Sequence, residues 1–284
     1  MRYEGDVYRP PSEAESLIIQ LTIGCAHNKC TFCTMYRGKK FRIRTFEEVC
    51  DDLQWVKQYY PYRFNKVFLA DGDALIVKTP DLIAVLDKVF ELFPHVRRVT
   101  TYGAAKDVLH KSHEELCQLR EHGLEMVYLG AESGSDKVLR DICKGVTAAE
   151  TAEACLKLKA AGIKTSMTLI TGLGGRADSR EHAVESAKLV SIAKPEYLGL
   201  LTLTMGGGSP LKKAYLAGEF QTLSATEFLE EQKLFLEHVD SEGTILRSNH
   251  ASNYVALAGT LNEDKERLIA QLEYAIQRGG RNDW

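Results

Sequence analysis

The stretch SLIIQLTIGCAHNKCTFC (residues 16–33) joins a run of apolar residues to a short loop that holds three cysteines. The run has the length and the β-branched content of a buried strand. Cys25, Cys30 and Cys33 are too many for one disulfide and one short of the four ligands of a structural zinc site. The chemistry of the loop therefore depends on whether the chain supplies a fourth ligand.

The same pattern of an apolar run followed by an amphipathic helix repeats along the chain. We expect strands at 16–24, 66–71, 96–102, 124–130, 163–172 and 196–205. Uninterrupted apolar strands that alternate with helices indicate a parallel sheet with crossover helices. Six such units predict an α/β fold, a partial (β/α)6 TIM-like barrel. In such a barrel the loops after the strands carry the site, and the cysteine loop follows the first strand.

The rhythm of strand and helix changes after MGGGSPL (205–211), where two helical segments flank TILRSNHASNYVALAG (244–259). We therefore expect residues 1–211 to form the barrel with an N-terminal extension. Residues 212–284 are then a short helical C-terminal cap packed on the same domain.

Composition restricts the class of protein. The formal charge of −3 argues against a dedicated nucleic-acid binder, which is usually basic over the whole domain. No apolar stretch approaches the ~20 residues of a membrane span, and the polar start MRYEGDVYRPPSEAE does not resemble a signal peptide. The seven cysteines are odd in number and four are scattered singly, which fits a reducing compartment. These features predict a cytoplasmic globular protein that does not act at a membrane.

The spacing C-x4-C-x2-C also occurs in plant-type ferredoxins, which add a distant fourth cysteine. Cys50, Cys117 and Cys155 fall within amphipathic helical patterns, where a cysteine is usually a small core residue. Cys143 ends a predicted helix near a later strand and stays open as a fourth ligand, as does His27 within the loop. Without a fourth ligand, three thiolates would leave one iron of a 4Fe–4S cluster open.

The chain resembles the radical SAM superfamily over roughly residues 15–211. The resemblance rests on the three cysteines after the first strand, on Phe32 before the third cysteine, and on YLGAESGSDKVLRDICKGVT (128–147). The last segment is similar to one shared by tRNA methylthiotransferases, the Elongator catalytic subunit and oxygen-independent coproporphyrinogen oxidases. The distance from Cys25 to Cys30 is one residue longer than the commonest spacing in the superfamily.

The resemblance implies two cofactors, a 4Fe–4S cluster held by the three loop cysteines and S-adenosylmethionine (SAM). In FLADGDAL (68–75) the backbone around Gly72 would take the amino group of SAM. Glu132 would meet the ribose, Lys144 the methionyl carboxylate, and the glycines of LITGLGG (169–175) the adenine. The implied SAM-binding residues are Asp71, Gly72, Asp73, Glu132, Lys144, Gly172 and Gly174. Read without the resemblance, these residues are strand-ending turns and a solvated lysine at a helix end.

The implied activity is reductive cleavage of SAM to a 5′-deoxyadenosyl radical that abstracts hydrogen from an unknown substrate. The electron would come from a donor such as flavodoxin or ferredoxin. A small-molecule substrate is favoured over a macromolecule because the C-terminal segment is short and shows no strongly basic RNA-binding domain. Two alternatives stay open, a non-catalytic iron–sulfur electron carrier or scaffold that also uses Cys143, and a zinc-binding structural protein.

Two further segments are candidates for binding a substrate. In RSNHASNY (247–254), Arg247, Asn249 and His250 offer side-chain donors that suit either a pocket wall or a turn network. Tyr102, at the end of the third strand, is a further candidate. The basic run RGKKFRIR (37–44) is either a solvated loop or a contact for an anionic substrate.

Overall fold

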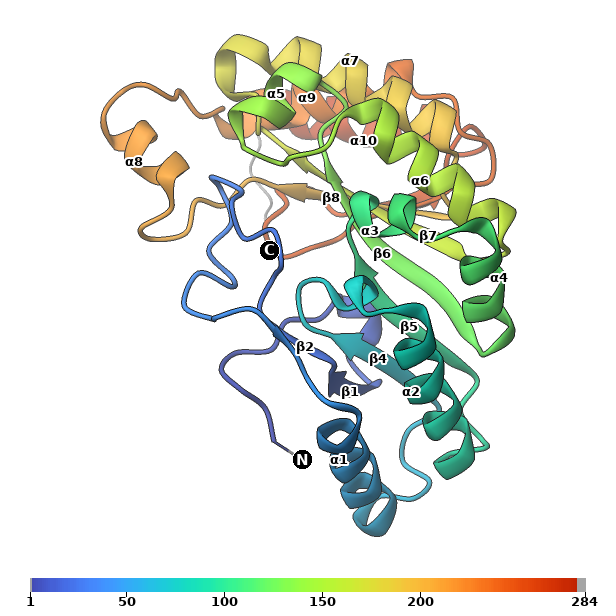
Figure 1. Ribbon diagram of the computed structural model, residues 1–284. Coiled ribbons are helices and arrows are strands. Elements are labelled where there is room, and N and C mark those ends of the chain that lie inside the picture. Colours follow the sequence, from blue (N-terminus) through green and yellow to red (C-terminus); the bar gives the residue numbers. More distant parts are fainter. Residues whose placement is uncertain (1, 280–284) are drawn as a thin grey trace. The chain divides into compact units, whose positions relative to one another are not determined.

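The computed structural model describes residues 2–279, which form two compact units (Figure 1). The first unit comprises the chain up to Asn28, Met35–Leu129 and Lys157–Thr165. The second comprises Lys29–Thr34, Gly130–Leu156 and the chain from Ser166 onward. The cysteine loop contributes to both, with Cys25 in the first unit and Cys30 and Cys33 in the second.

In the first unit the neighbouring strands follow the order β1-β4-β5-β6 and pair in parallel. They are β1 (Leu17–Gln20), β4 (Lys66–Ala70), β5 (Arg98–Gly103) and β6 (Leu124–Glu132), the last of which continues into the second unit. The helices are α1 (Phe46–Tyr59), α2 (Thr79–Leu92), α3 (Ala105–His110) and α4 (His113–Glu121), with short 3-10 helices η1 (Pro11–Glu13) and η2 (Ala74–Ile76). Helices α1, α2 and α4 follow one another along one face of these strands (Figure 1).

A separate antiparallel pair, β2 (Thr22–Ile23) and β3 (Arg42–Ile43), brackets the cysteine loop. Thr22 lies opposite Ile43, and Ile23 opposite Arg42. The predicted strand at 16–24 is therefore two strands, β1 and β2, which belong to different sheets. The cysteine loop is the connection between β2 and β3, so its two ends are held together by strand pairing.

In the second unit the neighbouring strands follow the order β7-β8-β9-β10. They are β7 (Lys164–Thr171), β8 (Tyr197–Thr202), β9 (Ile245–Ser248) and β10 (Leu257–Thr260). The helices are α5 (Asp136–Asp141), α6 (Ala148–Ala160), α7 (Gly175–Ala193), α8 (Pro210–Leu216), α9 (Ala225–His238) and α10 (Lys265–Gln277). The end of α6 and the start of β7, within Lys157–Thr165, belong to the first unit. β8 pairs in parallel with β7 and β9, whereas β10 is antiparallel to β9. The C-terminal region thus adds two strands to the sheet as well as the predicted helices, and α9 contacts both α7 and α10.

Local sequence explains where several helices begin. Three helices begin with a side chain that accepts a hydrogen bond from the backbone N–H of a glutamate three residues later, at Thr45, Ser112 and Ser224. The carboxylate of that glutamate in turn accepts from the backbone N–H of the Thr or Ser. These capping boxes satisfy N–H groups that a helix start otherwise leaves unpaired. The strands behave as expected for a parallel sheet, since four of the five residues of β4 are buried.

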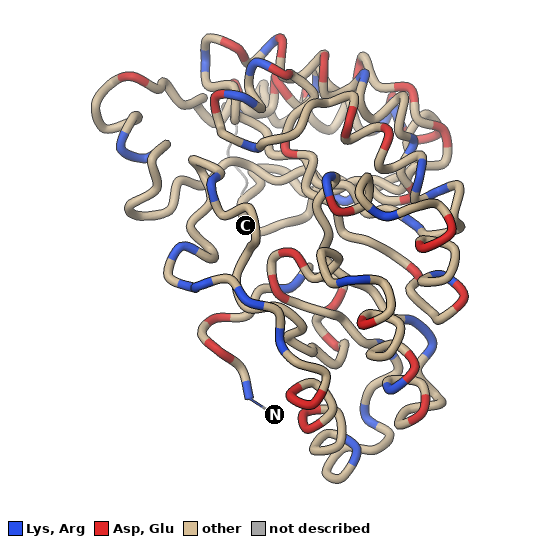
Figure 2. Tube along the Cα trace, viewed as in Figure 1, with Lys and Arg blue, Asp and Glu red and all other residues tan. Residues whose placement is uncertain are grey.

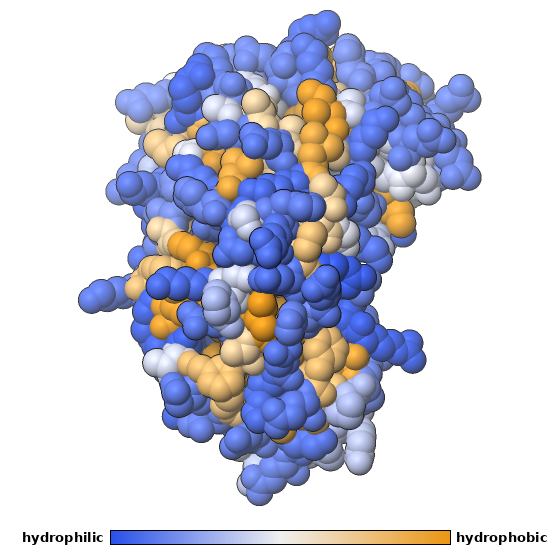
Figure 3. All heavy atoms as spheres, turned by 45° about the vertical axis from the view of Figure 1, so that its right-hand side comes forward, coloured by the Kyte–Doolittle hydropathy of each residue, from blue (hydrophilic) through white to orange (hydrophobic). Residues whose placement is uncertain are grey.

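The six predicted parallel strands are all present, and the α/β class is confirmed. The proposed division at residue 211 stays a prediction, although residues 212–279 lie in the same unit as 166–211. Among residues 2–279 no helix is both long and apolar enough to cross a lipid bilayer. On the face of the molecule seen in Figure 3, hydrophilic residues separate the apolar ones into small patches.

Candidate cofactor site

In the first unit, Cys25 lies against the backbone that follows β4. A Cβ atom placed on Gly72 would lie 2.9 Å from Cys25 Cβ and 2.5 Å from the Tyr36 ring, so only glycine fits there. Cys25 Sγ also accepts a hydrogen bond of 3.5 Å from the Asn28 backbone N–H. The predicted SAM amino-group segment and the first predicted cluster cysteine are therefore neighbours.

In the second unit, Cys30 and Cys33 lie on a short segment that is tied to α5 and α8. The Thr31 N–H donates to the Ile142 carbonyl at 2.9 Å, and the Thr31 carbonyl accepts from the Leu211 N–H at 3.0 Å. Phe32 packs on a buried apolar cluster that includes Ile142 and Leu211. The aromatic residue before Cys33 is thus the hydrophobic anchor of this segment.

The cluster ligand set stays a prediction, because Cys25 belongs to one unit and Cys30 and Cys33 to the other. Within residues 2–279 no three His, Cys, Asp or Glu side chains are arranged as ligands of a metal ion. The donor chemistry nevertheless fits an iron–sulfur cluster, which takes cysteine thiolates as ligands. Cys143 follows α5 in the left-handed conformation (φ 55°) and is exposed. The Thr31–Ile142 bond places its backbone beside the Cys30–Cys33 segment.

Glu132 and Lys144, the predicted ribose and carboxylate contacts, come together in the second unit. Lys144 Nζ donates to Glu132 Oε1 at 2.9 Å, and the side chains are only 16% and 12% exposed. Glu132 ends β6 in the left-handed conformation (φ 67°), which is uncommon for a residue other than glycine. A Cβ on Gly130 would lie 2.3 Å from Glu132 Oε1 and 3.3 Å from Lys144 Nζ. The three residues form a polar cradle, in which the carboxylate and the ammonium lie against the backbone of Gly130 because this residue has no side chain.

Gly172 and Gly174 have structural reasons of their own. Gly172 adopts φ 87°, and a Cβ there would lie 2.2 Å from the Phe228 ring of α9. Its N–H donates to Glu231 Oε1 at 2.6 Å. Gly174 is the residue before α7. The packing of α9 therefore accounts for Gly172, and its contact with adenine stays a prediction.

A buried polar network behind Glu132 was not found from the sequence. His182 bonds Ser133 Oγ through Nδ1 at 2.8 Å and donates through Nε2 to the Ile170 carbonyl at 3.1 Å. The Glu231 carboxylate lies 3.6 Å from His182 Nε2, and burial raises the pKa of this carboxyl group above its ordinary value. Because Glu231 and His182 hold the ends of β6 and β7 from helices α9 and α7, they support the predicted ribose and adenine segments.

The predicted substrate residues stay a prediction, because Tyr102 belongs to the first unit and Arg247, Asn249 and His250 belong to the second. Tyr102 packs edge-on against Phe68 with ring centroids 4.9 Å apart, and burial raises its pKa. Arg247, Asn249 and His250 are exposed, and His250 Nδ1 bonds Ser252 Oγ at 2.8 Å. This contact belongs to a turn network, the alternative left open above.

Asn253, in the same donor-rich RSNHASNY segment, reaches the carboxyl end of β8. Its Oδ1 accepts from the Thr202 N–H at 2.7 Å, and its Nδ2 donates to the Leu200 carbonyl at 2.8 Å. Asparagine suits this position because its amide both donates and accepts. Asn253 therefore ties this segment to the end of β8.

The basic run at 37–44 is largely neutralised inside the first unit. Figure 2 shows its Lys and Arg positions in blue on the loop after the cysteines. Arg42 pairs with Glu4 and Glu48, and Arg44 lies 2.9 Å from Asp52 with both side chains buried. The hydrogen bonds from Arg42 lower the pKa of Glu48 to about 2. Arg42 and Arg44 therefore form ion pairs within the first unit, and a contact of the run with an anionic substrate stays a prediction.

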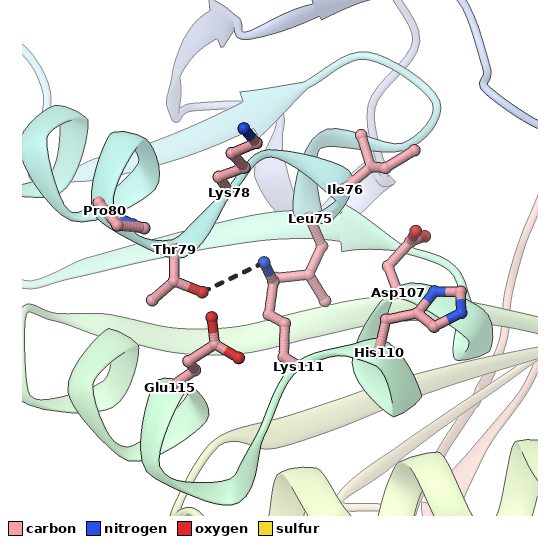
Figure 4. Close-up of a pocket in the computed structure, with 9 residues that line it drawn as sticks. All are labelled: Leu75, Ile76, Lys78, Thr79, Pro80, Asp107, His110, Lys111 and Glu115. Carbon is pink, nitrogen blue, oxygen red and sulfur yellow. Dashed lines mark hydrogen bonds between the residues drawn. The ribbon is translucent and has the colours of Figure 1, made fainter.

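A cavity of about 330 Å³ lies elsewhere in the first unit (Figure 4). Burial lowers the pKa of the Lys111 ammonium group, which donates to the Val77 carbonyl at 2.8 Å and to Thr79 Oγ1 at 3.4 Å. The residues that line the cavity are Leu75, Ile76, Lys78, Thr79, Pro80, Asp107, His110, Lys111 and Glu115. None of the predicted site residues is among them.

The comparisons with known proteins identify the family. The sequence profile of the radical SAM superfamily matches residues 19–190, more than half of the chain. A putative methylthiotransferase of Methanocaldococcus jannaschii is 26% identical over 239 residues, covering 78% of this chain and 52% of the relative. The threonylcarbamoyladenosine tRNA methylthiotransferase MtaB of Rickettsia prowazekii is 23% identical over 271 residues, covering 89% of this chain and 62% of the relative. The chain thus spans about half the length of the first relative and under two thirds of the second.

Solved structures with the same fold include coproporphyrinogen III oxidase from Escherichia coli (TM-score 0.58, 15% identity, 78% of this chain and 52% of that one). Methylornithine synthase gives a TM-score of 0.55 at 18% identity over 94% of this chain and 82% of that one. At such identities the likeness concerns the fold, and it confirms the predicted partial TIM-like barrel. With the profile match and the cysteine loop, these comparisons show that the chain belongs to the radical SAM superfamily, whose enzymes use a 4Fe–4S cluster and S-adenosylmethionine.

Proposed function

We propose that this enzyme cleaves SAM reductively at a 4Fe–4S cluster held by Cys25, Cys30 and Cys33, and that the resulting radical abstracts hydrogen from a small-molecule substrate. When bound, the cluster supplies one electron that breaks a carbon–sulfur bond of SAM, giving methionine and a 5′-deoxyadenosyl radical. Transfer of a hydrogen atom from the substrate converts that radical to 5′-deoxyadenosine. The protein supplies binding, orientation and protection from solvent.

The polar cradle of Gly130, Glu132 and Lys144 is the observation that carries the proposal. The Lys144 ammonium can donate to a carboxylate, and the Glu132 carboxylate beside it can accept from hydroxyl groups, so the pair suits a ligand that brings both. Lys144 would exchange its bond to Glu132 for one to the methionyl carboxylate. Glu132 would then accept hydrogen bonds from the ribose hydroxyls.

The backbone at Gly72 is proposed to take the amino group of SAM. Its close approach to Cys25 supports this role, since amino and carboxylate groups must reach the same iron. Carbonyl oxygens of a backbone turn accept from an ammonium group without needing a side chain. The residues proposed to bind SAM are Asp71 and Asp73 by their backbones, Gly72, Glu132, Lys144, Gly172 and Gly174.

A SAM titration followed by electron paramagnetic resonance tests the proposal. The reduced, reconstituted protein should show a cluster signal that changes as SAM is added and saturates at one SAM per cluster. A control with Lys144→Met should need a higher SAM concentration for the same change. A cluster signal that does not respond to saturating SAM would refute the function.

A second function, an iron–sulfur electron carrier or scaffold, is favoured by the position of Cys143. The Thr31–Ile142 bond brings its backbone beside the Cys30–Cys33 segment, as a fourth cysteine ligand would require. The same titration separates the two functions, because a cluster with four cysteine ligands has no open iron for SAM. Cys143→Ser should then lose the cluster, whereas it should keep it if SAM occupies the open iron.

The partners of this enzyme are also part of the proposal. An electron donor such as flavodoxin or ferredoxin is required by the one-electron step. The relative named as a tRNA methylthiotransferase suggests tRNA as another class of substrate, but this chain spans only 62% of its length. The formal charge of −3 and the paired basic run favour a small molecule. A cytoplasmic location remains our prediction.

A further inference from the structure

We propose that Asp71 is a positioning residue whose buried carboxylate clamps the two ends of the cysteine loop together. This inference rests on the proposed function in that the loop is taken to hold the cluster. The sequence placed Asp71 among the SAM contacts. In the structure its side chain binds the loop ends, while its backbone stays a proposed contact of SAM.

Three donors converge on one oxygen of this carboxylate. Asp71 Oδ2 accepts from the Gly24 N–H at 2.9 Å, from Lys39 Nζ at 2.8 Å and from Gln20 Nε2 at 3.2 Å. Gly24 directly precedes Cys25, and Lys39 lies beyond Cys33 at the other end of the loop. The same oxygen therefore binds the residue that enters the loop and a residue that leaves it.

Because this contact is buried, leaving either charge without its partner would cost free energy. The Asp71 side chain is fully buried and that of Lys39 is 11% exposed, so the carboxylate depends on the lysine for its counter-charge. Lys39 also bonds the Asp6 carbonyl, and its ammonium lies 5.6 Å from the centre of the Tyr36 ring. A Cβ on Gly24 would lie 3.2 Å from Lys39 Cβ, which shows how closely the two loop ends are packed.

The clamp reinforces the pairing of β2 with β3. The Asp71 N–H contacts Thr22 Oγ1 at 3.4 Å, and Thr22 is paired with Ile43 across the base of the loop. Asp71 is followed by Gly72, whose backbone lies against Cys25. One residue thus fixes the loop ends and also aligns the predicted amino-group segment with the first cysteine. A loop closed in advance loses less entropy when it takes up its ligand.

The test compares four variants in the metal-free and the cluster-loaded protein. Asp71→Asn removes the negative charge. Lys39→Met removes the ammonium group that Asp71 binds at one loop end, and Lys39→Arg keeps a cation there. Lys164→Met is the control, because it breaks an ion pair of the same length, 2.8 Å, in the same unit, whose side chains are 47% and 27% exposed. The measurements are amide hydrogen exchange of residues 24–39 without metal and the rate at which a chelator removes iron from the loaded protein.

Lys39→Met and Asp71→Asn should each raise both rates by about tenfold or more, with exchange elsewhere in the first unit unchanged. Both rates in Lys39→Arg should stay within about threefold of those in the parent protein, and both rates in Lys164→Met should equal those of the parent. Amide exchange of residues 24–39 that is unchanged in Lys39→Met and Asp71→Asn overturns the proposal. Faster exchange over the whole first unit also overturns it, because that result indicates a general loss of stability. If the parent protein takes up no cluster, the proposed function fails, whereas exchange in the metal-free protein still tests the clamp.

Discussion

Lys144→Met is the change whose effect can best be worked out from the structure. In the SAM-free protein the ammonium of Lys144 is 2.9 Å from Glu132, and both side chains are mostly buried. A charge-assisted hydrogen bond contributes about 1.5–3 kcal/mol, and about 1.4 kcal/mol corresponds to a factor of ten in affinity. Loss of the bond to the methionyl carboxylate should therefore weaken SAM binding about 10- to 100-fold.

The ion pair adds a second effect that a double mutant isolates. In Lys144→Met, Glu132 loses its counter-charge and would face the negative carboxylate of SAM. Glu132→Gln should weaken binding by a similar factor, because one acceptor of the ribose hydroxyls is lost. The double variant relieves the repulsion, so it should bind SAM about fivefold more tightly than the product of the two single effects predicts, a coupling of about 1 kcal/mol.

The assay is equilibrium dialysis of labelled SAM against anaerobically reconstituted protein, with iron and sulfide measured for each variant. All variants should keep the cluster, since neither residue is a predicted ligand. Lys137→Met is a matched control, because Lys137 is an exposed lysine on α5 in the same unit. A SAM affinity within about twofold of the parent in Lys144→Met would refute the role of that residue. Strictly additive effects in the double variant would refute the exchange of partners.

Three further predictions concern the cluster, the buried network and the substrate side. Changing any of the three loop cysteines to Ala should abolish the brown absorbance of the reconstituted protein. Cys50→Ala should retain it, because Cys50 lies in α1 and burial raises the pKa of its thiol; loss of colour in Cys50→Ala would show that the ligand set is wrong. Burial raises the pKa of Glu231, so the folded protein holds the carboxyl proton more tightly than the unfolded chain does. The parent protein should therefore lose free energy of unfolding, relative to the Glu231→Gln variant, as pH rises from about 4.3 toward the raised pKa of Glu231. A denaturant titration that finds the difference independent of pH would contradict this. His250→Ala should leave SAM cleavage without substrate nearly intact, since the side chain is exposed and bonds within its own turn; a large loss of 5′-deoxyadenosine would instead place His250 near SAM.

The features predicted well from the sequence are those carried by local patterns. The parallel strands follow from uninterrupted apolar runs, and β6 with its polar end was recognised from one continuous segment. Glu132 and Lys144 lie in that same segment, twelve positions apart, so a motif could bring them together. The structure agrees because the short helix α5 between them returns the chain to the strand end.

The features that were missed depend on partners distant in the sequence. Asp71 is bound by Gln20, Gly24 and Lys39, which lie 51, 47 and 32 positions away. No periodicity links these positions, so the DGD turn was interpreted from its local chemistry alone. Glu231 reaches Gly172 across 59 positions for the same reason. The four-residue strands β9 and β10 are too short for an alternation pattern to stand out from the flanking helices.

The central claim is tested most directly by looking for the products of SAM cleavage. Anaerobically reconstituted protein with about four irons per chain should be reduced with dithionite, or with reduced flavodoxin, in the presence of SAM. Chromatography should then show 5′-deoxyadenosine and methionine in equal amounts, formed slowly even without the natural substrate. A fully loaded cluster that yields neither product with either reductant would contradict the assignment of this chain as a SAM-cleaving enzyme.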